Sequence, residues 1–538
     1  MATTLIGCIQ SDKEKGAKHF EQTLDALGGK EALLNLKSFQ ISTTGSSYAT
    51  HMGLLPNDVK KTSTYSKKYT VEIKSWSIRT DANRQFTYVP EHGFPEQRYR
   101  VVTVDGIGSV SNGAHPLGLP GGVLPSQAVA SMEKSMKLMN PQLLLKEVLE
   151  GKRDIQFGGT TTHEEQAFNI LIVSDDVAPI KLYIHAESGT ISMLETIENN
   201  MILRDVALVV TYKNWEIAKT LAFPMEVEIT VAGNRLHHQL KTEVIEDLTI
   251  EEDFFALPKT NTTPKHDKEA YLTGLNTHHI HDEFFEIAGL YYIEEVSLTP
   301  TRLAQGIYQV RDNSANHLGG MIVEQENGVV VIEAHTSKAV SDELIKIVEK
   351  LFPNKAITHL IQSHHHVDHA SGVRTVISQG ADLVVGNGVG SWWKDVLKAK
   401  STIRPDGMSK FTEQPVVLEI ESKGKMTISD NNIEITAYHI LENPHALDMV
   451  ITKVETENEI FLYEADLYNA GFGFTMAFGG PQSLFKAMKR LELIDDNCAS
   501  PKPLTIIPGH GRPMKLNDAI VELNKVDIDV GCANDINK

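Results

Sequence analysis

The spacing of apolar and polar residues changes along this chain, and each pattern predicts a different kind of element. In residues 13–36 the apolar positions recur at helical intervals around a glycine pair, which indicates one or two short helices. From residue 39 to about 257, apolar and polar side chains alternate, most clearly at 225–231, as is typical of half-buried strands. We therefore expect a long antiparallel sheet with a helical interruption at 127–149.

A polar stretch punctuated by proline separates this region from the C-terminal half. Residues 258–265 carry two prolines among polar side chains, a composition typical of a connector. Beyond it, apolar strands flank Asn327 and Gly328 as in a hairpin, and a helical pattern follows at 341–351. The predicted division is an N-terminal domain at 1–260, a connector at 261–295 and a C-terminal domain at 296–538.

The densest group of chemically active residues reads H-L-I-Q-S-H-H-H-V-D-H, from His359 to His369. An apolar strand predicted to end near Gln362 and a helix predicted to begin near Ala370 place this motif in a loop. Two imidazoles separated by one residue can face one ion, while the turn brings the next carboxylate and imidazole toward a second ion. The residues that fit this scheme are His364, His366, Asp368 and His369. His365 falls between them, and we expect it to point away and to serve packing or support.

Three further candidate ligands follow, each near the end of an apolar run. His445 lies in E-N-P-H-A-L-D, Asp466 closes I-F-L-Y-E-A-D, and His510 lies in P-G-H-G. The three cysteines of the chain form neither a disulfide framework nor a thiolate cluster with zinc-finger spacing. Any metal site is therefore expected to use histidine and carboxylate.

Together these motifs resemble the H-x-H-x-D-H sequence and the later motifs of the metallo-β-lactamase superfamily, in the family's order. The resemblance implies an α+β protein, in which an N-terminal antiparallel β-rich domain precedes an αββα sandwich. It also implies a first ion held by His364, His366 and His445, and a second held by Asp368, His369 and His510, with Asp466 bridging. Zinc is the expected metal for both ions, and Fe or Mn would also suit these ligands. One departure stands at Glu333-Ala334-His335, where many members have an aspartate, and the role of His335 is left open.

Two cations that share a carboxylate trap a water between them and lower its pKa toward neutrality. The expected activity is therefore hydrolysis of a small molecule by a metal-bridging hydroxide, on an ester, lactone, thioester or related bond, with Asp368 orienting the nucleophile. Two alternatives stay open. Persulfide dioxygenases resemble this site but use a single iron, held by residues matching His364, His445 and Asp466. An apolar-ligand binding module would use the metal site only for structure.

Net charge and hydropathy limit the classes of partner that we expect this protein to bind. The net charge of -19 disfavours nucleic acid, because binding to phosphates relies on lysine and arginine. No run of about 18 apolar residues occurs, so no membrane-spanning helix is expected. Leu5-Ile6-Gly7-Cys8 resembles a lipobox: if it is genuine, Cys8 carries a lipid anchor and the protein is periplasmic or membrane-anchored; otherwise the protein is cytoplasmic. The oligomeric state is left open.

Two other histidine groups attract attention but lack a complete set of ligands. His237 and His238 are neighbours in a predicted strand and should point to opposite faces of it, so we do not expect them to share an ion. His278, His279 and His281 lie in the connector without nearby motif carboxylates, and a solvated loop is the expected structure there.

Overall fold

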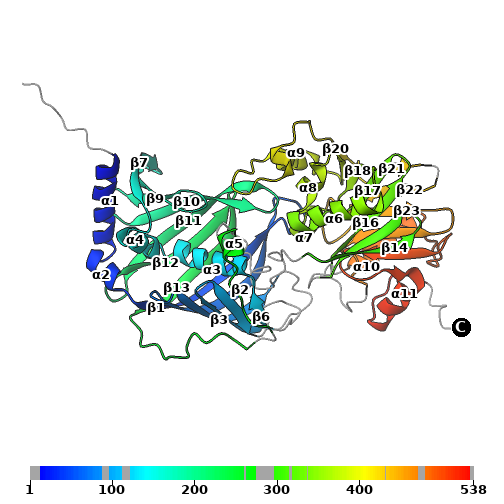
Figure 1. Cartoon of the computed structure of the whole chain (residues 1–538). Coiled ribbons are helices and arrows are strands. Elements are labelled where there is room, and N and C mark those ends of the chain that lie inside the picture. The colour runs from blue at the N-terminus through cyan, green and yellow to red at the C-terminus, as the bar shows by residue number, and fades with distance from the viewer. Residues whose placement is uncertain are drawn as a thin grey trace, which may run out of the picture.

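The computed structural model describes residues 12–87, 96–111, 121–259, 262–273, 296–313, 318–335, 337–430, 432–470 and 479–532. Within them, the N-terminal half forms one wide, curved sheet and the C-terminal half forms two smaller sheets (Figure 1). The lipobox-like segment that ends at Cys8 and the connector histidines at 278–281 lie outside the described residues.

Two helices open the described part of the chain, as the spacing predicted. Helix α1 (Asp12–Ala26) is followed by α2 (Lys30–Asn35). Gly28 and Gly29 separate them with φ values of 111° and 96°, which glycine adopts without the steric cost that a side chain would bring. This explains why the helical pattern breaks at the glycine pair.

The alternating segments form one 13-stranded sheet in which every described pairing is antiparallel, in the order β6-β5-β4-β3-β2-β1-β13-β12-β11-β10-β9-β8-β7. Its strands are β1 (Ser38–Thr50), β2 (Val59–Glu72), β3 (Ser77–Phe86), β4 (Gln97–Val104), β5 (Ile107–Ser111), β6 (Gly122–Leu124), β7 (Ile155–His163), β8 (Gln166–Val173), β9 (Ile180–His185), β10 (Ile191–Asn200), β11 (Arg204–Ile217), β12 (Ala222–Val231) and β13 (Asn234–Glu246). The predicted antiparallel sheet is confirmed.

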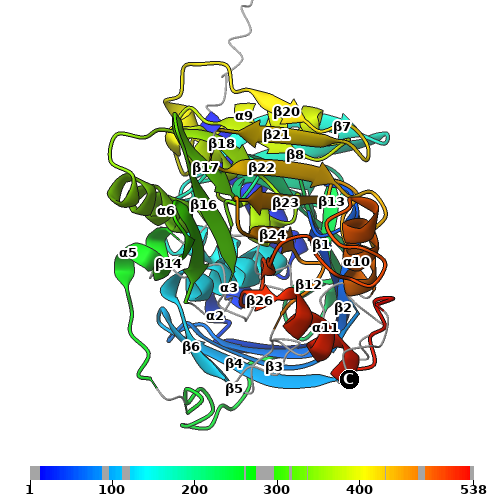
Figure 2. The same ribbon diagram turned by 90° about the vertical axis from the view of Figure 1, so that its right-hand side faces the viewer.

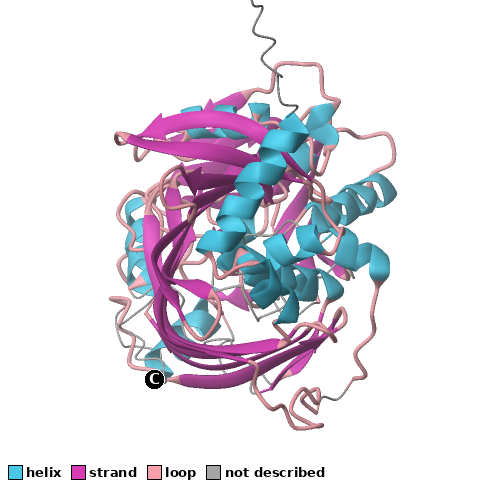
Figure 3. Cartoon of the chain, turned by 90° about the vertical axis from the view of Figure 1, so that its left-hand side faces the viewer, coloured by secondary structure: helices cyan, strands magenta, loops and turns pink. Residues whose placement is uncertain are grey.

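Helices α3 (Ser126–Met139) and α4 (Gln142–Leu149) account for the predicted helical interruption, and the sheet curves around them (Figure 3). Apolar side chains of both helices share one buried cluster with Phe39 and Ile41 of β1. The short helix α5 (Lys268–Thr273) packs beside α3. The cluster borders Lys241 of β13, whose Nζ donates to Oδ1 of Asn140 at 2.9 Å, and burial lowers the pKa of Lys241 to about 7.

The C-terminal half forms a seven-stranded sheet, in the order β14 to β20, and a six-stranded sheet, in the order β21 to β26. The first contains β14 (Leu298–Ala304), β15 (Ile307–Asp312), β16 (Gly319–Gln325), β17 (Gly328–Ile332), β18 (Ile357–Ile361), β19 (Asp382–Val385) and β20 (Val417–Glu419). The second contains β21 (Lys425–Ser429), β22 (Glu434–His439), β23 (Val450–Glu455), β24 (Ile460–Ala465), β25 (Leu504–Pro508) and β26 (Met514–Lys515).

These two sheets pack face to face between helices (Figure 2). Val323 and Ile332 of the first sheet share a buried cluster with Ile435 and Ile451 of the second. The helices that pack on the outer face of the first sheet are α6 (Lys338–Leu351), α8 (Val373–Ile377) and α9 (Gly390–Lys398), and those that join the second sheet are α10 (Gly480–Arg490) and α11 (Leu516–Lys525). The predicted αββα sandwich is therefore confirmed.

Two details differ from the sequence-based expectations. Helix α7 (Val367–Ala370) begins three residues earlier than predicted, because the motif residues Asp368 and His369 form its first turn, where a carboxylate is favoured by the helix dipole. Cys498 and Cys532 form a disulfide, although the cysteine spacing had indicated no disulfide framework. Sequence spacing could not show this bridge, because 34 positions separate the two residues along the chain.

Among the residues that the structure describes, no helix combines the length and apolar character needed to cross a membrane.

Candidate metal centre

The motif between β18 and α7 supplies four of the seven candidate ligands. His364 and His366 lie in the loop after β18, and Asp368 and His369 lie in the single turn of α7. Parallel pairing of β17, β18 and β19 places this loop at the carboxyl end of the strands, where loops of α/β layers commonly carry ligands.

The other three candidate ligands come from the second sheet. His445 lies between β22 and β23, Asp466 directly follows β24, and His510 follows β25. Strands β24 and β25 are parallel neighbours, so their carboxyl ends carry Asp466 and His510 to the same edge. The structure thus brings all seven predicted residues together where the two sheets meet.

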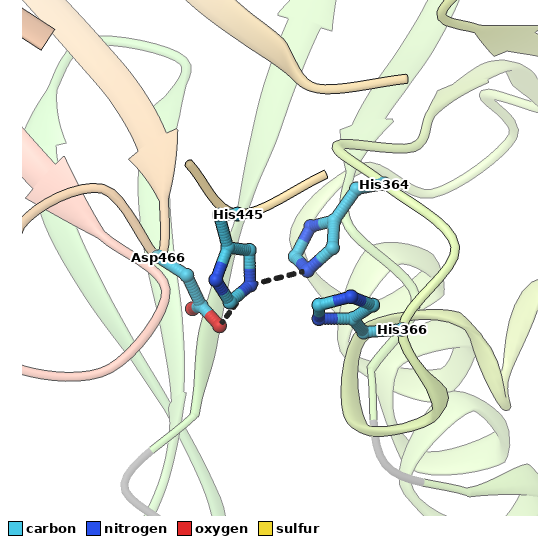
Figure 4. A group of neighbouring side chains, drawn as sticks. All are labelled: His364, His366, His445 and Asp466. Atoms are coloured by element: carbon cyan, nitrogen blue, oxygen red, sulfur yellow. Dashed lines mark hydrogen bonds and ion pairs between the residues drawn. The ribbon is translucent and has the colours of Figure 1, made fainter. Parts of the chain in front are cut away.

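The first group consists of His364, His366, His445 and Asp466, whose ligand atoms all lie within 4.8 Å of one another (Figure 4). Nε2 of His445 lies 3.2 Å from Nε2 of His364 and 3.2 Å from Oδ2 of Asp466. Donor atoms bound tetrahedrally to zinc at about 2.0–2.1 Å stand about 3.3 Å apart, so these separations suit one ion.

The second group consists of Asp368, His369, His510 and again Asp466. Nε2 of His369 lies 3.0 Å from Oδ1 of Asp466, and Nε2 of His510 lies 3.2 Å from Oδ2 of Asp368. Each oxygen of the Asp466 carboxylate therefore faces a different group. This arrangement suits a carboxylate shared by two cations.

Buried polar atoms without hydrogen-bond partners mark the same place. Nδ1 of His366 and Oδ1 of Asp368 are buried and make no hydrogen bond. Leaving such atoms unsatisfied costs about 1–3 kcal/mol each, unless a ligand occupies the space between them. The donor set and these two orphaned atoms fit divalent cations held by nitrogen and oxygen.

The electrostatics of the two groups differ. Burial and neighbouring imidazoles hold the pKa values of His364 and His366 well below the usual range, so both stay neutral and can ligate. Burial also disfavours a charged His369, yet Asp466 and Asp368 raise its pKa well above the usual value. The second group thus has an excess of negative charge that attracts a proton, and a bound cation would relieve it in the same way.

Glu333 supports the second group and was not predicted to do so. Its buried carboxylate lies 3.3 Å from Nδ1 of His369 and accepts hydrogen bonds from the Tyr463 hydroxyl at 2.8 Å and from Gln362. Glu333 has a φ of 77°, a left-handed conformation that costs energy for a residue with a side chain. The sequence shows a glutamate where many superfamily members have an aspartate, but it does not show that this residue contacts His369.

His335, whose role the sequence left open, is buried beside the candidate metal centre. Burial and the nearby His369 and His510 lower its pKa to about 3. His365 points to Asp448, with Nδ1 2.7 Å from Oδ1 and both side chains buried. Asp448 stands in the same motif as His445, but nothing in the spacing showed that it would meet His365.

A backbone group from the N-terminal half also reaches the centre. Nε2 of His366 donates to the carbonyl oxygen of Gly53, in the loop between β1 and β2, at 2.8 Å. No sequence signal indicated this contact, because the two residues are 313 positions apart and a carbonyl group leaves no trace in side-chain chemistry.

His237 and His238 do not share a site. Nε2 of His237 lies 2.8 Å from the Tyr65 hydroxyl, whereas His238 contacts Glu226 at 3.2 Å. The pair therefore divides between the two faces of β13, as expected for neighbours in a strand.

Part of this chain is similar to known proteins. Residues 320–390 match the family model described as the metallo-beta-lactamase superfamily. The linear primary-alkylsulfatase of a Pseudomonas species is 32% identical over 84 residues, which cover 16% of this chain and 12% of that protein.

Solved structures that match part of this chain include the metallo-beta-lactamase from Pontibacter korlensis, with 16% identity and a TM-score of 0.33. The DIM-1 metallo-beta-lactamase follows with 15% identity and a TM-score of 0.31. In both comparisons 43% of this chain covers 100% of the other.

The segment matched by the family model contains the H-x-H-x-D-H residues, and the later motifs converge on them in space. Residues 320–390 of this chain are therefore similar to the metallo-β-lactamase superfamily, and the H-x-H-x-D-H motif lies within them.

Proposed function

We propose that this protein is a metal-dependent hydrolase with a dinuclear centre. The first ion is held by His364, His366 and His445, the second by Asp368, His369 and His510, and Asp466 bridges the two. Zinc is the proposed metal at both positions, because these nitrogen and oxygen donors suit it, with iron or manganese as the alternatives.

One observation carries the proposal: the two oxygens of the Asp466 carboxylate face two different ligand groups. Oδ2 lies 3.2 Å from His445, and Oδ1 lies 3.0 Å from His369. A single structural ion would need only one of these groups, and structural zinc sites are usually closed by four protein ligands. Two groups that share one carboxylate favour a catalytic pair of ions.

Bound cations at such a centre supply a water of lowered pKa and polarise the bond under attack. The chain itself supplies the orientation. Burial would raise the pKa of Asp368, but the charge of His369 and the hydrogen bond from His510 hold it below its ordinary value. Asp368 is therefore ionised at neutral pH, as a residue that accepts a hydrogen bond from the attacking water must be.

The substrate we propose is a small molecule with an ester, lactone, thioester or related bond. The partial match to an alkylsulfatase adds sulfate esters to this group of bonds. The ligands alone do not distinguish this hydrolase from a persulfide dioxygenase, which would use a single iron on His364, His445 and Asp466, so the number of bound ions decides between them. The sharing of Asp466 between two groups argues against a purely structural metal in a binding module.

The deciding experiment measures metal content and hydrolysis on the same purified protein. Elemental mass spectrometry is expected to find two zinc ions per chain. The protein is then assayed against a carboxylic ester, a lactone, a thioester and an alkyl sulfate, before and after chelation. Turnover of at least one of them that is lost with the metal and restored by zinc supports the proposal.

Two other outcomes would contradict it. One iron per chain, together with oxygen consumption on a persulfide, would identify an oxygenase. Two ions without hydrolysis of any bond in the panel would reject this group of substrates.

A further inference from the structure

We propose that the loop of residues 51–58, between β1 and β2, is part of the metal centre and holds His366 in the orientation that binds the first ion. This inference rests on the proposed function. It gives the N-terminal sheet a role in metal binding, through the carbonyl group of Gly53.

The tautomer of His366 follows from the contact with Gly53. A carbonyl oxygen can only accept a hydrogen bond, so the proton of the neutral imidazole lies on Nε2, which is 2.8 Å from that oxygen. Nδ1 then keeps its lone pair. Because Nδ1 is buried and makes no hydrogen bond, and His366 belongs to the first ligand group, Nδ1 is the atom that would be available to the ion.

In other candidate histidine ligands, the second ring nitrogen contacts a residue of the C-terminal half. Nδ1 of His364 lies 2.9 Å from the hydroxyl of Ser363, and Nδ1 of His369 lies 3.3 Å from Glu333. Metal-binding histidines commonly donate their second nitrogen to such a partner, which fixes the ring orientation. Among the described contacts of the seven candidate ligands, only His366 takes this partner from the N-terminal sheet.

The loop is braced internally, so Gly53 has a fixed position. Nδ1 of His51 lies 2.8 Å from the carbonyl oxygen of Pro56, and the carboxylate of Asp58 accepts from the backbone N–H of Leu55 at 2.9 Å. His51 is buried, with its ring 5.7 Å from that of Trp392 in α9. A braced loop can hold a ligand in place, whereas a mobile one could not.

The loop is also joined to the neighbouring ligand motif. The carbonyl oxygen of Leu54 accepts from the backbone N–H of Leu447, two residues beyond His445, at 2.9 Å. The same loop thus contacts both motifs that supply histidines to the first ion. The second group, in contrast, obtains its described supporting contact from Glu333.

Three further contacts fix the N-terminal sheet against the C-terminal half. Ala49, Met52 and Phe86 belong to the buried cluster that covers the outer face of the first C-terminal sheet. At the start of β11, Asp205 accepts a hydrogen bond from the backbone N–H of Thr402 at 2.7 Å, and Arg204 lies 3.5 Å from Asp406. The loop is therefore carried by a packed interface rather than by a single hydrogen bond.

Gly53→Ala tests the inference, because a Cβ at this position would lie 2.4 Å from Cβ of Asp58 and must displace the loop. Zinc affinity is measured by chelator competition in two backgrounds. His510→Ala leaves the first group intact, and His364→Ala leaves the second. We expect Gly53→Ala to weaken zinc binding about 10–100-fold in the first background and to change it by less than about twofold in the second.

Two more variants complete the test. Asp58→Ala removes the brace on Leu55 without adding an atom, and we expect it to weaken the first ion by a smaller factor. Gly122→Ala is the matched control, because a Cβ there meets nothing within 4 Å, and it should leave both affinities unchanged. Thermal melting and circular dichroism establish that each variant is folded, and Asp58→Ala alone decides the question if Gly53→Ala does not fold.

The inference would be overturned if, in the His510→Ala background, the Gly53→Ala and Asp58→Ala variants bound zinc as tightly as the protein with an unchanged loop. The proposed function would still stand. Equal losses in both backgrounds would also overturn the inference, because the loop would then act on the whole fold. Absence of bound metal in the unchanged protein would instead reject the proposed function itself.

Discussion

The carboxylate of Glu333 lies 3.3 Å from Nδ1 of His369, and both side chains are fully buried. His369 in turn faces Asp466 and Asp368 through Nε2. One imidazole therefore connects a supporting carboxylate to the two carboxylates of the second ligand group. This chain of contacts predicts how that group responds to substitution.

Glu333→Gln should weaken the second ion about 10–100-fold and leave the first nearly unchanged. The amide keeps the size of the side chain but removes the negative charge that orients and polarises His369. Chelator competition on the Glu333→Gln variant with His510 retained would show tight zinc binding at the first site and weakened binding at the second.

Tyr463→Phe is the control for this change. It removes one hydrogen bond to Glu333 but leaves the carboxylate beside His369. We expect a loss of less than about tenfold, since a contact twice removed from the ion matters less. A larger effect from Tyr463→Phe than from Glu333→Gln would contradict the assigned role of the charge.

His365→Ala should leave both ions in place and lower the stability of the fold. Nδ1 of His365 lies 2.7 Å from Asp448 and does not face either ligand group. Removing one partner of a buried pair strands the other charge, so the free energy of unfolding should fall by about 3 kcal/mol. Elemental analysis and chemical denaturation measure the two effects separately.

The double variant His365→Ala, Asp448→Ala sharpens this prediction. If the two residues act as a pair, the combined loss should be smaller than the sum of the single losses, because no stranded carboxylate remains. Loss of an ion in His365→Ala would show instead that the ligand assignment within the H-H-H run is wrong.

The seven candidate ligands could be predicted because each stands in a short motif beside an apolar strand. The spacing within such a motif can be read from the sequence alone, so His364, His445 and Asp466 could be named before their positions in space were known. The structure brings them together within two groups of ligand atoms. Their action as ligands stays a prediction until metal is measured.

The supporting contacts could not be predicted, for two physical reasons. Gly53 acts through a carbonyl group that every residue has, and its partner lies 313 positions away. Glu333 and Asp448 are identifiable as buried carboxylates only after the sheets have packed. The disulfide between Cys498 and Cys532 could not be predicted either, because two cysteines far apart in the sequence meet only when the chain has folded.

Asp466→Ala should reduce metal binding at both groups and lower turnover more than about a hundredfold, because even contacts that only support a ligand are worth 10–100-fold. The fold should survive, since the strands that carry the site pair through their backbones. Asp430→Ala, in a turn far along the same sheet, is the control. Unchanged activity with full metal content in Asp466→Ala would reject the bridging role.

Lys241→Met should stabilise the protein below neutral pH and much less in strong alkali. In the unfolded chain the pKa of Lys241 is its ordinary value near 10.5, whereas burial lowers it to about 7 in the folded chain. Between these values the unfolded chain binds a proton that the folded chain does not, so the free energy of unfolding rises with pH across this window. Below pH 7 the full cost of a buried ammonium is present.

The cost that Lys241→Met removes is at most about 5 kcal/mol, since a tenfold change in proton affinity corresponds to about 1.4 kcal/mol. The lost hydrogen bond to Asn140 reduces the gain by about 1 kcal/mol. Urea denaturation at pH 6 and pH 10.5 measures the difference, with the exposed Lys68→Met as control. A stabilisation that is the same at both pH values would mean that Lys241 titrates normally, and that the polar groups around Asn140 hold a charged amine inside the sheet.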